Sequence, residues 1–147
     1  MKLIGFNLNK ITANINPGYK RGHSINTNVE FLNLEKETLD LLKEGEVIRI
    51  DFNYAVTHTL KEKKEEEKQG EILIKGILAL STEKEETKAF LKSWKKKEIP
   101  EEYRIPLINL ILEKCSVKAA SLSEDVGLPL HLPIPRIARQ TPTEEKS

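Results

Sequence analysis

The chain has 147 residues, enough for one domain with its own core. Charged residues make up 32% of it and nearly cancel, leaving a formal net charge of +1, which argues against a nucleic-acid partner. No run reaches the ~20 apolar residues of a membrane span, and the one cysteine excludes an internal disulfide and a cysteine-based zinc site. We therefore expect a soluble, cytoplasmic protein without membrane insertion. Abundant Lys and Glu beside only two glutamines is a composition found in thermophile proteins.

The first half of the chain follows the period-two pattern of β-strands. In the first strand Phe6 and Leu8 share one face, and the phase then shifts by one residue. The shift comes after Asn9 and Lys10, and it predicts a bulge or a strong bend. The apolar residues that continue the strand are Ile11, Ala13 and Ile15. A second strand is predicted around Ile25, Thr27, Val29 and Phe31.

Residues 35–46 fit either a helical turn or an extension of a hairpin. The third strand is the clearest element, because five apolar residues alternate strictly with other residues: Ile48, Ile50, Phe52, Tyr54 and Val56. Residues 61–68 carry four charges of each sign and are interpreted as a solvated hairpin tip. The fourth strand is apolar on both faces between Ile72 and Leu80, so we expect it at the centre of the sheet or at an interface.

After residue 81 the pattern changes to that of helices. Thr82 and Glu85 have the spacing of a capping box, and the helix they begin carries an apolar stripe of Phe90, Leu91 and Trp94. Pro100 is expected to open a second helix, whose buried stripe is Leu107, Ile108, Ile111 and Leu112. Ser116 is a candidate cap of a third helical segment, and Gly127 is its expected stop.

Few residues are spaced as catalytic or metal-binding groups are. His23, His58 and His131 lie in three separate segments, so we predict no metal site and expect exposed positions for them. Cys115 is interpreted as a small buried apolar residue rather than a nucleophile. Without a catalytic triad or a phosphate-binding loop, we predict neither an enzyme nor a cofactor. Residues 117–128 are spaced like the first helix of a helix-turn-helix unit, but the prolines that follow exclude a recognition helix.

The exit from the helical region, residues Gly127–Ile137, is apolar and rich in proline, and we call it the exit strip. Its prolines exclude a helix and remove backbone donors, so it is extended. A soluble protein must bury such a strip or use it on a partner. It can pack across its own sheet or helices, join two copies of the chain, or form the wall of a groove that accepts extended apolar segments of other proteins. The apolar residues on its one side are Leu128, Leu130, Leu132 and Ile134.

The order of four antiparallel strands, helices and this exit resembles the SecB chaperone family. The residues that carry the resemblance at the exit are Gly127, Leu128, Pro129, Leu130, Leu132, Pro133 and Ile134. The run from Lys10 to Ile15 is similar to the family's first strand, in which a basic residue precedes alternating apolar residues. The resemblance implies an α+β fold, a four-stranded antiparallel sheet followed by two or three helices packed on it. It covers roughly residues 2–137 and indicates an archaeal or thermophile-type member. We predict one domain over residues 1–138, and the composition of residues 139–147 predicts a flexible tail.

The resemblance also implies a function, which is to hold non-native polypeptides without ATP as a homo-oligomer, either a dimer or a tetramer. Clients would lie in apolar grooves between helices and sheet, lined by Phe52, Tyr54, Phe90, Trp94, Leu128, Leu130, Leu132 and Ile134. Whether such a chaperone serves secretion or a toxin–antitoxin system stays open. The alternative interpretation is a non-catalytic α+β module that binds one specific protein or a small ligand through the same apolar face.

Overall fold

The computed structural model describes residues 1–19, 24–37, 46–62 and 65–132. Its elements are β1 (Lys2–Ile15), β2 (Ser24–Glu37), β3 (Glu46–Glu62), β4 (Glu65–Thr82), α1 (Lys84–Trp94) and α2 (Glu101–Val126). The predicted α+β class is confirmed, with four strands preceding the helices. Of the ambiguous residues 35–46, the first three extend β2 and Glu46 begins β3, while 38–45 lie outside the described residues.

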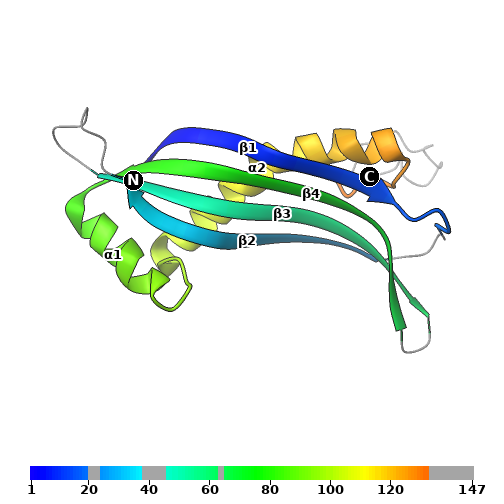
Figure 1. The fold of residues 1–147 in the computed structure, drawn as a ribbon, viewed down its shortest axis with the longest axis horizontal. Helices are drawn as coiled ribbons and strands as arrows, with labels where there is room; N and C mark the ends of the chain where they lie inside the picture. Colours follow the sequence, from blue (N-terminus) through cyan, green and yellow to red (C-terminus); the bar gives the residue numbers. More distant parts are fainter. Residues whose placement is uncertain (20–23, 38–45, 63–64, 133–147) are drawn as a thin grey trace, which may run out of the picture.

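The four strands form one antiparallel sheet in the order β1-β4-β3-β2 (Figure 1). β3 and β4 are the two central strands and form the long hairpin predicted around the charged run, with Glu62 opposite Glu65. The predicted central position of β4 is confirmed, while its outward-facing apolar residues Leu73, Ile77 and Ala79 are half-buried. The first strand, β1, pairs only with β4 within the described chain and is therefore one edge of the sheet.

Register shifts occur in both outer strands. The pairing of β1 with β4 shifts between Leu3 and Gly5 and again between Leu8 and Lys10, and the latter shift confirms the bulge predicted from the phase shift. The shift between Phe31 and Asn33 in β2 brings the buried Leu34 onto the side of the sheet that carries the core. β2 continues six residues beyond Phe31. The bulge lets the residues after it alternate again between the two faces of the sheet, although the sequence pattern shows a break there.

The core lies on one face of the sheet, which we call the inner face. The alternating residues of β3 point to it, from Ile48 through Tyr54 to Leu60, and all are buried. Gly76 of β4 lies opposite Phe52, whose ring occupies the space that a side chain at this position would need. Phe6 of β1 stacks on the same ring with 5.3 Å between centroids. Glycine in this strand thus makes room for an aromatic pair.

The first helix begins one residue later than its capping pattern indicates. Glu83 is the N-cap and forms the capping box with Glu86, so the predicted pair of Thr82 and Glu85 is wrong. Thr82 is instead the buried last residue of β4, and its hydroxyl lies 2.7 Å from that of Thr87. Along the helix Phe90 and Trp94 are buried as predicted. Leu91 is exposed, because it lies one residue outside the stripe that faces the sheet.

The second helix is continuous over 26 residues, so the predicted third segment does not exist. Its buried residues recur every fourth position and form a single stripe against the inner face: Leu107, Ile111, Cys115, Ala119 and Ser123. Ile108 and Leu112, which were predicted to belong to this stripe, are half-buried beside it. Ser116 does not cap a helix, because its hydroxyl lies 3.3 Å from that of Tyr54 instead.

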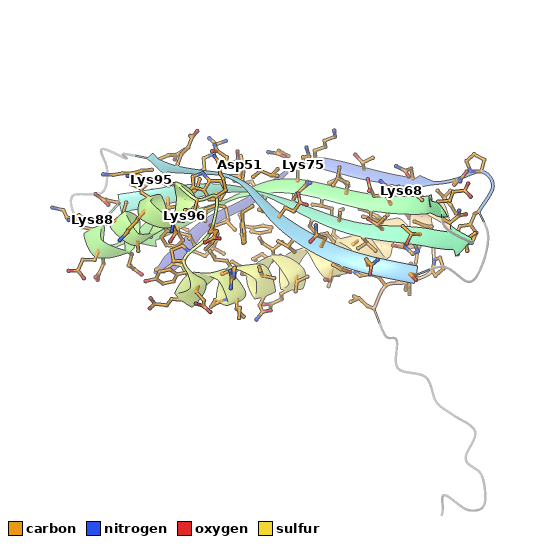
Figure 2. The ribbon with its side chains drawn as sticks, turned by 90° about the horizontal axis from the view of Figure 1, so that it is seen from below. Asp51, Lys68, Lys75, Lys88, Lys95 and Lys96 are labelled. Atoms are coloured by element: carbon orange, nitrogen blue, oxygen red, sulfur yellow. The ribbon has the colours of Figure 1, made fainter. Side chains whose placement is uncertain are left out.

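The molecule has two layers, a sheet and a pair of helices. Figure 1 shows α2 crossing the sheet obliquely, from the corner near α1 to the side of β1. The opposite, outer face is largely polar, as expected for an antiparallel sheet with one face in water. In Figure 2, Asp51 and Lys75 lie on the side of the sheet away from α2. The Arg49 guanidinium lies 3.5 Å from the Asp51 carboxylate on this face.

Candidate functional site

The exit strip turns back onto the inner face as soon as α2 ends. Gly127 adopts a left-handed conformation with a φ of 77°, which confirms it as the helix stop. The amide of Leu128 then donates to the carbonyl of Ser123 at 2.8 Å, and this bond directs the chain toward the sheet. Leu128 is 4% exposed, Leu130 and His131 are half-buried, and Leu132 is 37% exposed. The strip therefore packs on its own subunit at its start and emerges from it within five residues.

Leu128 occupies a hollow that a glycine of β4 leaves open. A methyl group added to Gly70 would lie 2.7 Å from Cδ2 of Leu128 and 3.0 Å from the backbone oxygen of Asn14. Real side chains do not approach so closely, so the hollow exists only because residue 70 has no side chain. A branched aliphatic group from the exit strip fills it.

Three polar side chains meet where the exit strip lies against β3 and α2. The Tyr54 hydroxyl lies 3.0 Å from Nε2 of His131 and 3.3 Å from the hydroxyl of Ser116. The Nδ1 atom of His131 is buried and has no hydrogen-bond partner among the described residues. Burial lowers the pKa of His131, and burial is also the main reason why the pKa of Tyr54 is raised. The cluster therefore favours a neutral imidazole.

This cluster does not have the geometry of a nucleophile and its base. Ser116 contacts Tyr54 rather than His131, whereas an activated serine needs a hydrogen bond to the base itself. The arrangement instead attaches the strip to the sheet through one polar contact beside the apolar contact of Leu128.

The structure places seven of the eight predicted client-binding residues, and they fall into two groups. Phe52, Tyr54 and Phe90 are fully buried and Trp94 is 9% exposed, so these four are part of the core. Leu128, Leu130 and Leu132 form the exit strip beside α2, and Ile134 lies outside the described residues. Tyr54 links the groups, because its ring is in the core while its hydroxyl contacts His131. Sequence analysis missed Ser116 and Gly70, since neither residue type is informative until the fold brings the exit strip beside it.

A second apolar surface lies along the edge strand β1, and the sequence did not identify it. Ile4, Leu8 and Ile11 are each at least 36% exposed. Leu8 and Ile11 are on the inner face, because they pair with Gly76 and Ile74 of β4. They stay exposed where α2 leaves the edge of the sheet uncovered.

Two further residues that could carry chemistry, Cys115 and His58, are both fully buried. Burial raises the pKa of the Cys115 thiol to about 11, as expected for a small core residue. His58 is fully buried, which corrects the expectation that it is exposed, because it lies on the inner face opposite Gly70. His23 lies outside the described residues. No group of three or more metal-binding side chains occurs among the residues that the structure describes, and no described helix is long and apolar enough to cross a membrane.

A surface depression of about 480 Å³ lies at the start of α1. Charged and hydroxyl-bearing side chains line most of it, among them Lys2, Glu83, Lys84 and Glu86. Small-molecule sites usually have apolar and aromatic walls with a few polar groups. This depression therefore gives no support to the alternative of a small-ligand module.

Comparison with known proteins found no matching family model and no matching curated protein. Among solved structures, the chain is similar to the SecB-like chaperone Rv1957 of Mycobacterium tuberculosis, in complex with a ChAD peptide from the Rv1956 HigA1 antitoxin. The sequence identity is 11% and the TM-score is 0.48, and the similarity covers 95% of this chain and 92% of that chain.

Proposed function

We propose that this protein is a holding chaperone that binds non-native polypeptides in extended form without ATP. The observation that carries the proposal is the seat of its own exit strip. An apolar segment that is neither helix nor strand lies on the inner face beside α2, with Leu128 in the hollow at Gly70 and His131 on Tyr54. A surface that accepts this segment has the shape and the chemistry for an apolar segment of another chain. Leu130 and Leu132 would form the more exposed part of the same surface.

The role proposed for the buried aromatic residues differs from that of the strip. Tyr54 would become a wall of the groove when its hydroxyl is released from His131. Phe52, Phe90 and Trp94 would contact a client only if the core opened, so their contact with clients stays a prediction. A client role for Ile134 also stays a prediction.

The exposed residues of β1 support a homo-oligomer, a dimer or a tetramer. An edge strand offers unpaired backbone groups, and proteins usually protect such edges with charges. β2, at the other edge, exposes one large apolar residue, Leu32, beside the charged residues Glu30, Glu35 and Lys36. β1 exposes three large apolar residues, Ile4, Leu8 and Ile11, beside Lys2 and Lys10. We infer that the β1 edge is covered by a second copy.

The test of the function uses the full chain and guanidinium-unfolded citrate synthase, diluted into buffer without ATP and followed by light scattering. Suppression of aggregation at stoichiometric ratios is expected. A chain that leaves the scattering unchanged at a fivefold excess would refute the proposal.

The oligomer is tested separately by mass in solution. Ile11→Lys should reduce the mass to that of a monomer, because the charge would be buried between copies. Asn9→Lys, at an exposed position of the same strand, is the control and should leave the mass unchanged. A wild-type monomer at micromolar concentration would contradict the inference.

A further inference from the structure

The part of the exit strip that touches its own subunit, Leu128–His131, is held by few contacts. We call this segment the plug. Its first residue is almost fully buried, but the residue after it, Pro129, is exposed, and Leu130 and His131 are half-buried. Apolar stabilisation follows the area removed from water, so most of the apolar attachment comes from Leu128 alone.

The polar attachment of the plug is incomplete. His131 shares one hydrogen bond with Tyr54, while its Nδ1 atom is buried without a partner in the part of the chain that the structure describes. A buried polar atom without a partner costs free energy, which offsets part of what the bond contributes. Tyr54 would not lose its last partner if His131 left, because the hydroxyl of Ser116 lies 3.3 Å away. The Tyr54 hydroxyl therefore keeps a hydrogen-bond partner with or without the plug.

The hollow itself does not depend on the plug. Gly70 lies within the central strand β4, where Asn14 of β1 and the neighbouring β3 hold the backbone in place. When Leu128 leaves, the hollow remains as an apolar seat for one branched aliphatic side chain. The Tyr54 hydroxyl, which His131 contacts three residues after Leu128, can then form a hydrogen bond with a client in place of His131.

We propose that the plug is an internal competitor that occupies the client groove until an extended apolar segment of a non-native chain displaces it. The occupant that replaces it carries a Leu or Ile at the Gly70 hollow and continues across Tyr54 and Ser116. This inference rests on the proposed function for the identity of the client. The competition itself depends only on the contacts of the plug. A groove that the plug occupies most of the time exposes less apolar surface. The apparent affinity for clients is then reduced in proportion to the fraction of molecules whose groove is open.

The experiment measures binding of a fluorescein-labelled peptide Gly-Leu-Pro-Leu-His-Leu, the sequence of residues 127–132, to the full chain by anisotropy. His131→Ala removes the polar contact and Leu128→Ala empties the hollow, so both variants free the groove. Leu91→Ala is the matched control, because the same truncation is made at an exposed position of α1, outside the exit strip. If the plug is docked about 90% of the time, the first two variants bind the peptide ~10-fold more tightly than wild type. Leu91→Ala binds it as wild type does.

A control peptide with glycine in place of the first leucine should bind the variants more weakly, because it cannot fill the hollow. Circular dichroism shows whether each variant folds. If Leu128→Ala does not fold, His131→Ala alone decides, since its side chain is only half-buried.

Equal affinity of wild type and the folded variants for the peptide, or binding by none of them, overturns the plug. The aggregation assay is run on the same proteins and decides the other question. Tighter peptide binding without suppression of aggregation supports the plug and refutes the chaperone function. If wild type suppresses aggregation but binds the peptide as tightly as the variants do, the chaperone function is supported and the plug is refuted.

Discussion

Replacing Gly76 by alanine tests the packing of the core at the most crowded point of the sheet. The added methyl group would lie 2.6 Å from Cζ of Phe52 and 2.7 Å from the backbone oxygen of Asn7. Neither neighbour can yield easily. The Phe52 ring is fully buried and stacked on Phe6, and the Asn7 oxygen belongs to the backbone of β1. Overpacking of this kind costs about 1–3 kcal/mol of the free energy of unfolding.

Gly5→Ala is the matched control in the paired strand. A methyl group there would lie 3.5 Å from Cβ of Ala79, which is an ordinary contact. Alanine is favoured over glycine inside a strand by about 0.5–1 kcal/mol, because the unfolded glycine has more conformational freedom. Both variants gain this amount, so they are expected to differ in stability by the overpacking cost alone, roughly 1–3 kcal/mol, with Gly76→Ala the less stable.

The assay is urea unfolding followed by the fluorescence of Trp94, which is the one tryptophan and is largely buried. For a small protein whose stability falls by ~2 kcal/mol per molar urea, the midpoints should lie about 1 M apart. All three proteins are compared at one concentration, because an oligomer is stabilised by mass action. Midpoints of Gly76→Ala at or above those of Gly5→Ala would refute the packing described around Phe52.

Three further predictions concern α2 and the plug. Ile111→Ala should lower the free energy of unfolding by about 2–5 kcal/mol, since the side chain is fully buried. Val117→Ala, at a 72% exposed position of the same helix, should change it by less than ~0.5 kcal/mol. Equal urea midpoints of the two variants would show that α2 presents another face to the sheet. Cys115, with a pKa of about 11, should react with a disulfide reagent at pH 8 only after unfolding, and rapid labelling of the native protein would contradict its burial. The pKa of His131 lies below its usual 6.5 because burial disfavours the imidazolium, and Tyr54 and Ser116 are the groups in its hydrogen-bonded cluster. Docking of the plug is therefore at full strength above pH 6.5 and weakens as the pH falls below 6.5 toward the lowered value. The measurement is hydrogen exchange of the Leu130 and His131 amides, corrected for the intrinsic effect of pH. Exchange should become faster below pH 6.5 in wild type and not in His131→Phe. Identical pH profiles in the two proteins would show that the imidazole does not help to hold the plug.

The strands and their faces could be predicted from the sequence because their pattern is local. Strict alternation in β3 and the phase shift at Asn9 and Lys10 each follow from the two-residue period of an extended backbone. Gly127 could be predicted as a helix stop because a left-handed residue is needed there whatever lies around it.

Predictions from local sequence were wrong where a side chain contacts a residue that is distant in the sequence. Ser116 has the residue type of a helix cap, but Tyr54 offers its hydroxyl a partner 62 residues away, and α2 continues through it. Leu8 and Ile11 follow the inward pattern correctly and still remain exposed. Periodicity indicates the face of a residue and not whether a helix covers that face.

The sequence by itself predicted that residues 127–137 are apolar and not helical, because the run is rich in leucine and proline is excluded from a helix interior. Only the tertiary structure decided where the described part of this strip lies. The hollow at Gly70 and the hydroxyls of Tyr54 and Ser116 come from three separate elements, and they meet only when α2 crosses the sheet. A site built from such long-range contacts has no local pattern, since each of its residues has another ordinary use in a strand or a helix.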